Sequence, residues 1–169
     1  FAGAQILTGF AADGDAEFVW PLPLGAARLA VDGLSAWFLL AIGLVTSCVA
    51  VYSAAYMRTL AQRAQIPAYG TLLCALVAFL LLVVTAADAA LFLAAWEGVM
   101  LAAFFLISFH DKRPEVRNGA WTYVIANHIG TALCVIPLFG ILVAQARTTA
   151  FGAFPEALAG LDSATLSGL

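Results

Sequence analysis

The chain has 169 residues, of which 64% are hydrophobic and only 10% are charged, and its formal net charge is −3. Soluble domains contain about 45–50% apolar and about 25% charged residues, so this composition excludes an ordinary water-soluble globular protein. With seven Lys and Arg against ten Asp and Glu, the chain also lacks a basic surface for nucleic acid phosphates. We therefore expect a polytopic membrane protein that is embedded in the lipid bilayer and binds no nucleic acid.

Long runs without charged residues predict four membrane-spanning helices, because one span needs about 20 apolar residues. The runs cover residues 34–57, 69–87, 89–109 and 120–143, the third being interrupted by one acid, Glu97. Only Asp88 separates the second run from the third, which predicts a tight helical hairpin. Pro137 predicts a bend in the fourth span, since proline removes a backbone hydrogen-bond donor.

The predicted fold class is all-α, a polytopic transmembrane helical bundle with four complete spans. Residues 1–12 are apolar but too short to cross a bilayer. We interpret them as the end of a helix, and because the chain begins at Phe1 rather than Met, we expect residues 1–169 to be a fragment of one membrane domain.

The distribution of basic residues predicts the orientation of the spans. Four crossings place the connections alternately on two sides, and five basic residues share one side against two on the other. The positive-inside rule puts the first group in the cytoplasm. We expect an inner-membrane protein whose amino and carboxyl ends are both outside. The cytoplasmic group is Arg58, Arg63, Lys112, Arg113 and Arg117, and the outer group is Arg28 and Arg147.

Glu97 is the most informative single residue. It lies eight positions into its span, about 12 Å from the outer boundary at about 1.5 Å per residue. An acid in hydrocarbon costs roughly 2.5–3.5 kcal/mol on insertion scales, so it is expected to face the bundle interior, find a partner or take up a proton. We interpret Glu97 as a proton-relay or ion-pathway residue; the structural alternative is a neutral acid that hydrogen-bonds a neighbouring helix.

The fourth span has one polar face, and His128 is its ionisable member. An imidazole can carry protons near neutral pH, whereas polar side chains can also simply hold helices together; both roles stay open for His128. Counted from the outer ends, His128 lies about 22 Å deep against about 12 Å for Glu97, so we expect a water or a third residue between them. The supporting polar residues are Tyr123, Asn127 and Thr131.

Three further features complete the candidate chemistry. Asp88 is interpreted as a turn and cap residue, with reception of protons at a pathway mouth as its alternative role. Cys48, Cys74 and Cys134 stand alone in apolar runs and are expected to be buried free thiols. No nucleotide loop, cysteine cluster or metal-ligand spacing is present in the sequence, so we expect no metal, no cofactor and no redox centre in this segment.

Several motifs together resemble those of the antiporter-like, proton-translocating membrane subunits of complex I, group-4 membrane hydrogenases and multisubunit cation/proton antiporters. Asp32-Gly33-Leu34-Ser35 opens a span that ends in Tyr52-Ser53 and Tyr56-Met57. Asp88 is followed by Trp96-Glu97, and the next span contains His128-Ile129-Gly130-Thr131-Ala132. The last run looks most like component B of hydrogenase-4 and formate hydrogenlyase.

The resemblance implies a role for each matching residue. Glu97 matches the family's intramembrane glutamate, which pairs with a lysine on a later helix, and His128 matches an ionisable position on the next helix. It implies a non-catalytic subunit of a larger inverted-repeat fold, which couples electron transfer elsewhere in an oxidoreductase complex to the movement of H⁺, with Na⁺ as an alternative ion. The implied partners are other membrane subunits of a respiratory, hydrogenase or antiporter complex.

Two other functions compete with this interpretation. The first is a helical membrane anchor or assembly module that transports nothing and uses Glu97 to dock against a cationic residue of a neighbour. The second is a haem-binding four-helix cytochrome, which fits poorly because His110 and His128 are expected at different depths, whereas two axial ligands must meet at one level.

Overall fold

A computed structural model describes residues 16–19, 26–60, 66–110 and 113–159. The predicted stub at residues 1–12 lies outside these ranges, as do Arg63 and Lys112. The described part of the chain contains four helices long and apolar enough to cross a membrane, which confirms the predicted all-α polytopic fold. They are α2 (Gly33–Leu60), α3 (Ile66–Thr85), α4 (Ala89–Ile107) and a final helix over Pro114–Ala146.

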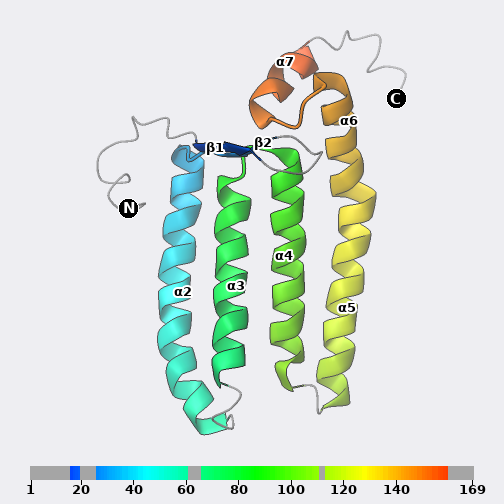
Figure 1. The fold of residues 1–169 in the computed structure, drawn as a ribbon. Coiled ribbons are helices and arrows are strands. Elements are labelled where there is room, and N and C mark those ends of the chain that lie inside the picture. The colour runs from blue at the N-terminus through cyan, green and yellow to red at the C-terminus, as the bar shows by residue number, and fades with distance from the viewer. Residues whose placement is uncertain (1–15, 20–25, 61–65, 111–112, 160–169) are drawn as a thin grey trace.

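The final helix is longer than predicted and has three parts: α5 (Pro114–Gly130), a π-helical turn (Thr131–Val135) and α6 (Ile136–Ala146). The Ile136 N–H bonds the carbonyl of Thr131, five residues back. Pro137, next along the chain, has no N–H with which to continue the α pattern to the carbonyl of Leu133. Beside the proline at which we predicted a bend, the structure has a π turn, through which the helix continues (Figure 1).

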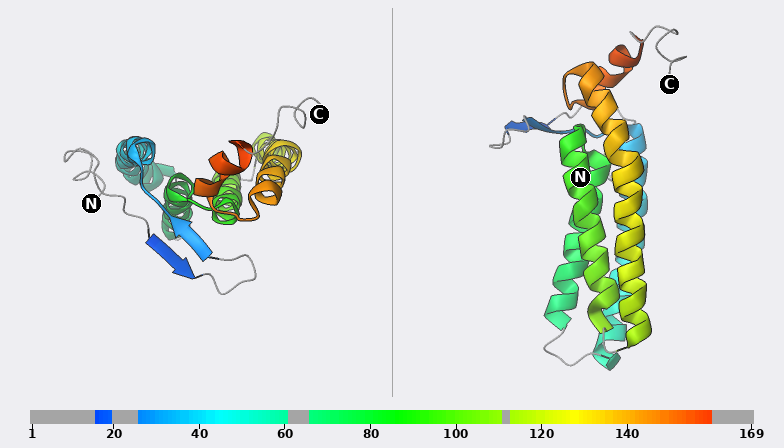
Figure 2. Two further views of the ribbon diagram at one scale, coloured as in Figure 1. Left: turned by 90° about the horizontal axis from the view of Figure 1, so that it is seen from above. Right: turned by 90° about the vertical axis from the view of Figure 1, so that its right-hand side faces the viewer.

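The four helices alternate in direction and stand in a curved row (Figures 1 and 2). Each helix packs on the next one along the chain, and α3 with α4 forms the most extensive contact. We call the end of the row that carries β1, β2 and α7 the strand end, and the other the loop end. In such a row most side chains face outward, and buried residues are concentrated in α4.

A small layer of extended backbone lies at the strand end, with the β1–β2 hairpin to one side of the row of helices (Figure 2). Strands β1 (Ala16–Val19) and β2 (Ala26–Leu29) form an antiparallel hairpin. The α3–α4 connection lies beside β2, since the Ala87 N–H bonds the carbonyl of Arg28 at 2.9 Å. On its other side, the Ala89 N–H bonds the carbonyl of Thr149 at 2.8 Å. After Thr149 come a 3₁₀ turn (Phe151–Ala153) and helix α7 (Phe154–Ala159).

The open row corrects one prediction. Cys48, Cys74 and Cys134 are free thiols as expected, but all three are exposed rather than buried. Their apolar neighbourhoods are consistent with contact with lipid or with other membrane helices, because a residue in an apolar run can point away from the row as easily as into it. An apolar sequence run predicts immersion in the bilayer, not burial within the chain.

Candidate functional site

Glu97 and His128 lie against each other where α4 meets α5. His128 Nε2 is 3.5 Å from Glu97 Oε2. Both helices pack along their length, and their directions oppose each other, so residues far apart in sequence reach one level (Figure 1). The side chains are 38% exposed for Glu97 and 48% exposed for His128. The pair therefore sits at the edge of the α4–α5 contact, open on one side.

This direct contact corrects the expected difference in depth. The prediction placed a water or third residue between the two side chains because it counted inward from residue 143 as the outer end of the fourth span. In the structure α6 runs on to Ala146 and rises past the strand end (Figures 1 and 2). The outer part of the helix thus lies beyond the level at which α4 begins, and His128 falls level with Glu97.

The histidine ring is oriented by its own helix. Nδ1 lies 3.0 Å from the backbone carbonyl of Val124, one turn earlier. A carbonyl oxygen can only accept, so this contact requires the proton on Nδ1. Nε2 then faces Glu97 with its lone pair when the ring is neutral and with a proton when the ring is charged. The two groups can thus share one proton, as carboxylic acid with neutral imidazole or as carboxylate with imidazolium.

The supporting polar residues behave differently from one another. Thr131 is buried, 4% exposed, and its Oγ1 accepts a 3.1 Å hydrogen bond from Trp96 Nε1 on α4. Asn127 donates to the carbonyl of Tyr123 on its own helix at 2.9 Å, and Tyr123 is half-buried. The structure therefore brings together Glu97, His128, Thr131 and the unpredicted Trp96.

Asp88 caps helix α4, as the sequence suggested. Its Oδ1 accepts from the backbone N–H groups of Ala90 at 2.9 Å and Leu91 at 3.2 Å, and its Oδ2 accepts from the hydroxyl of Thr149. The residue is 3% exposed. Asp88 thus ties the start of α4 to the segment after α6, and its alternative role at a pathway mouth stays a prediction.

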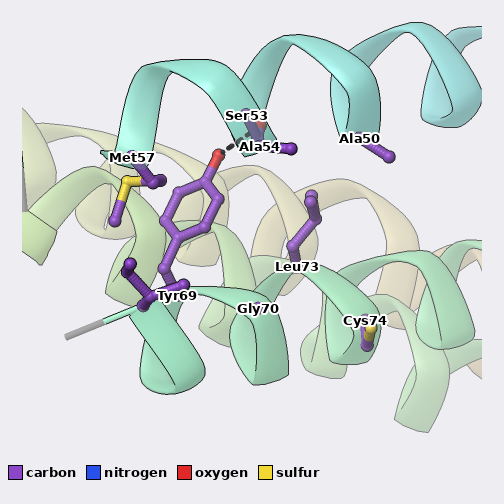
Figure 3. A pocket seen from close by; sticks show the side chains of 9 residues that line it. Ala50, Ser53, Ala54, Met57, Tyr69, Gly70, Leu73 and Cys74 are labelled. Carbon is purple, nitrogen blue, oxygen red and sulfur yellow. Dashed lines mark hydrogen bonds between the residues drawn. The ribbon is translucent and has the colours of Figure 1, made fainter. Parts of the chain in front are cut away.

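A second polar contact, which the sequence analysis missed, lies between α2 and α3 toward the loop end. The hydroxyls of Ser53 and Tyr69 are 3.0 Å apart and border a cleft of about 300 Å³ (Figure 3). Apart from these hydroxyls and the Cys74 thiol, the lining is apolar. Because the cleft contains no carboxylate and no imidazole, the Glu97–His128 pair is the stronger candidate for acid–base chemistry.

Comparison with known proteins identifies the family of this chain. The family described as "NADH-Ubiquinone oxidoreductase (complex I), chain 5 N-terminus" matches residues 26–65. NADH-quinone oxidoreductase subunit L of Mycobacterium tuberculosis is 32% identical over 126 residues, 72% of this chain and 19% of the relative. NADH-ubiquinone oxidoreductase chain 5 of Yarrowia lipolytica is 30% identical over 118 residues, 66% of this chain and 18% of the relative. The chain is a relative of the antiporter-like membrane subunits of complex I.

This relationship confirms the predicted family and a multi-pass membrane protein. The chain spans about a fifth of the length of the curated relatives it matches. The relatives named here are complex I subunits, so the finer likeness to component B of hydrogenase-4 stays a prediction that rests on the His128-Ile129-Gly130-Thr131-Ala132 run.

Proposed function

We propose that this chain is a segment of a proton-translocating membrane subunit of an oxidoreductase complex, in which Glu97 and His128 exchange a proton within the membrane. The observation that carries the proposal is the 3.5 Å approach of His128 Nε2 to Glu97 Oε2. Proton transfer takes place at heavy-atom distances of about 2.6–3.2 Å, so a small side-chain movement brings the pair within range. The likeness to complex I subunits supports the same function.

The distribution of charge within the pair provides a way to couple it to the rest of a complex. Moving one elementary charge through the membrane potential is worth about 2.3 kcal/mol per 100 mV. Electron transfer elsewhere in the complex would have to shift the proton between the carboxyl and the imidazole. The open side of both residues leaves room for a neighbouring ionisable group or water. An imidazole carries H⁺ and not Na⁺, so His128 favours the proton as the transported ion.

We further propose that the chain lies in an inner membrane with the strand end outside. The support is the five-to-two excess of basic residues that the sequence places in and beside the α2–α3 and α4–α5 connections. The proposed partners are lipid and the other membrane subunits of the complex, and the redox cofactors belong to those partners rather than to this segment.

The substitution Glu97→Gln tests the function directly. It keeps the size and hydrogen-bonding capacity of the side chain but removes the exchangeable proton. In the full-length subunit assembled in its complex and reconstituted in vesicles, we expect proton translocation, followed with a pH-sensitive dye, to fall roughly a hundredfold or more, the lower range for loss of an acid–base group. The matched control is Glu115→Gln at the exposed start of α5, which should pump normally.

Normal pumping by an assembled Glu97→Gln complex would contradict the proposal. In that case Glu97 would have no role in transport. Pumping that is lost only because the complex fails to assemble, as judged by native electrophoresis, would instead support the anchor or assembly module.

A further inference from the structure

The indole of Trp96 forms a second link between the same two helices, next to the acid–imidazole pair. Trp96 Nε1 donates to Thr131 Oγ1 at 3.1 Å. Trp96 directly precedes Glu97, and Thr131 follows His128 by three residues. Because α4 and α5 run in opposite directions, the link lies on the strand-end side of the pair, about one helical turn or less away. Any movement of Thr131 relative to α4 is thus transmitted to His128 over a very short stretch of helix.

Thr131 is also the first residue of the π turn. Its carbonyl accepts the Ile136 N–H, so this turn holds one residue more than an α turn would. If the turn relaxed to α geometry, the two flanking helices would rotate against each other by about 100°. α6 is held by aromatic contacts, since Phe139 packs on Phe92 of α4 with ring centroids 5.5 Å apart. Because Trp121 of α5 also packs on Phe104 of α4, with ring centroids 5.6 Å apart, the rotation would be shared between the two helices, and the part taken by α5 would carry the His128 ring away from Glu97.

A hydrogen bond at the first residue of the π turn opposes that rotation. The Thr131 hydroxyl is nearly inaccessible, so without the indole N–H it would lose its partner on α4 in a setting where water cannot easily replace it. The Trp96 ring is itself fixed by stacking on Phe92, with centroids 5.9 Å apart and planes 20° apart. The fixed indole N–H of Trp96 therefore donates to the buried hydroxyl of Thr131 at the point where α5 passes into the π turn.

We propose that Trp96 is a positioning residue: its hydrogen bond to Thr131 holds the π turn and thereby keeps His128 Nε2 within proton-exchange reach of Glu97. This inference rests on the proposed function of the pair. It assigns Trp96 no contact with the transferred proton, so its effect is exerted entirely through the position of His128.

Three variants separate positioning from general stability. Trp96→Phe keeps a stacking ring and removes the N–H, Thr131→Val replaces the hydroxyl with a methyl group of similar size, and Thr131→Ser keeps the hydroxyl. In the full-length subunit within its complex, we expect the first two to slow proton translocation about fivefold, the equivalent of one hydrogen bond, and Thr131→Ser to pump at the normal rate. The double variant Trp96→Phe/Thr131→Val should be no slower than either single variant.

An infrared measurement provides a readout that a purely structural role would not change. The carboxyl bands of Glu97 are assigned by their loss in Glu97→Gln, and they report the hydrogen bonding of that side chain. We expect these bands to shift in Trp96→Phe and Thr131→Val and to return to their original positions in Thr131→Ser. The assignment does not depend on pumping, so it holds even if Glu97 proves to have no role in transport.

Unchanged Glu97 bands in Trp96→Phe and Thr131→Val would overturn the inference, whether or not the amount of assembled complex falls. Fully additive effects in the double variant would overturn it too, because two independent contacts would then be involved. Normal pumping by Glu97→Gln together with shifted bands would refute the proposed function alone and leave the positioning role standing.

Discussion

Asp32 shows how one carboxylate decides where a span begins. It directly precedes α2, and its Oδ1 accepts the Ser35 N–H at 2.6 Å. The Ser35 hydroxyl in turn donates to the carbonyl of Val84 near the end of α3 at 2.9 Å. The hydrogen bond from the Ser35 backbone holds the pKa of Asp32 below its ordinary value of 3.8. The carboxylate of Asp32 thus makes the start of α2 sensitive to pH, and the hydroxyl of Ser35 joins it to α3.

The lowered pKa predicts a pH dependence of stability. A carboxyl whose pKa is lower in the folded state stabilises the fold above its unfolded pKa, and this contribution is lost as the pH falls through the folded pKa. We expect Asp32→Asn to have a lower thermal midpoint than the unchanged protein at neutral pH, and the difference to shrink below pH 3.8. Thermal unfolding in detergent across this range measures it, with Glu156→Gln on exposed α7 as control. A difference that does not depend on pH would contradict this account.

Individual residues differ in how well the sequence announces them. Glu97 and Asp88 stand out because an acid in or beside an apolar run has few energetically acceptable explanations. Trp96 and Ser53 do not stand out, since an indole or a hydroxyl is readily tolerated in an apolar helix. Their roles depend on which residue faces them from another helix, Thr131 for Trp96 and Tyr69 for Ser53. The sequence of one helix does not contain that information.

The contact between α3 and α4 depends on the absence of a side chain at Gly98. A methyl group built at this position would overlap the ring of Phe79 on α3. Packing of this kind is typical of membrane helices, where small residues allow close approach. The same small residue lies next to Glu97, so the most closely packed helix pair also carries the acid.

Gly98→Ala is expected to destabilise the protein even though alanine favours helix formation. Overpacking a well-filled contact costs about 1–3 kcal/mol, whereas the gain in helix propensity is about 1 kcal/mol. The control is Gly43→Ala on α2, where the added methyl group meets nothing within 4 Å. Thermal unfolding in detergent should show a lower midpoint for Gly98→Ala alone. Equal midpoints for the two variants would mean that Phe79 moves aside at no cost.

Whole elements were predicted as well as hydropathy allows. The four spans follow from runs of apolar residues, because a bilayer demands length and apolarity and little else. Strands β1 and β2 were missed, since four-residue strands of mixed composition carry no clear alternation. The length of the last helix was underestimated, because Pro114 at its first position reads as a loop residue although proline is favoured at the start of a helix. The mistaken depth of His128 came from the other end of this helix, where residue 143 was taken as the outer boundary although α6 continues to Ala146.

Hydrogen bonds at the strand end join segments that are far apart in the sequence and so help to hold the row of helices together. Backbone bonds join Ala87 to Arg28 on one side and Ala89 to Thr149 on the other. Asp88 lies between them and adds its bonds to Thr149 and to the first turn of α4. The packed row of helices is thus also fastened at the strand end, and in the part of the chain that the structure describes the few buried side chains are concentrated in α4.

Asp88→Ala and Thr149→Val should both weaken this fastening, but to different extents. Loss of the cap costs about 1 kcal/mol, and loss of the Thr149 bond costs about 0.5–1.5 kcal/mol. Asp88→Ala loses both, Thr149→Val only the second, and Thr149→Ser neither. The thermal midpoint of the full-length protein should therefore be lowest for Asp88→Ala, higher for Thr149→Val and unchanged for Thr149→Ser. If Asp88→Ala and Thr149→Val lowered the midpoint equally, the cap on α4 would contribute nothing.

The pairing of Glu97 with His128 also has a consequence for biosynthesis. His128 follows Glu97 by 31 positions, and a ribosome that adds about 5–20 residues per second completes the histidine roughly 2–6 s after the glutamate. Because the chain leaves the ribosome in sequence order, the acid reaches the insertion machinery ahead of its imidazole companion by about the same interval. The inserted part of the nascent chain therefore contains the Glu97 carboxyl before it contains the His128 imidazole. The rate of translation sets how long the carboxyl is without its partner.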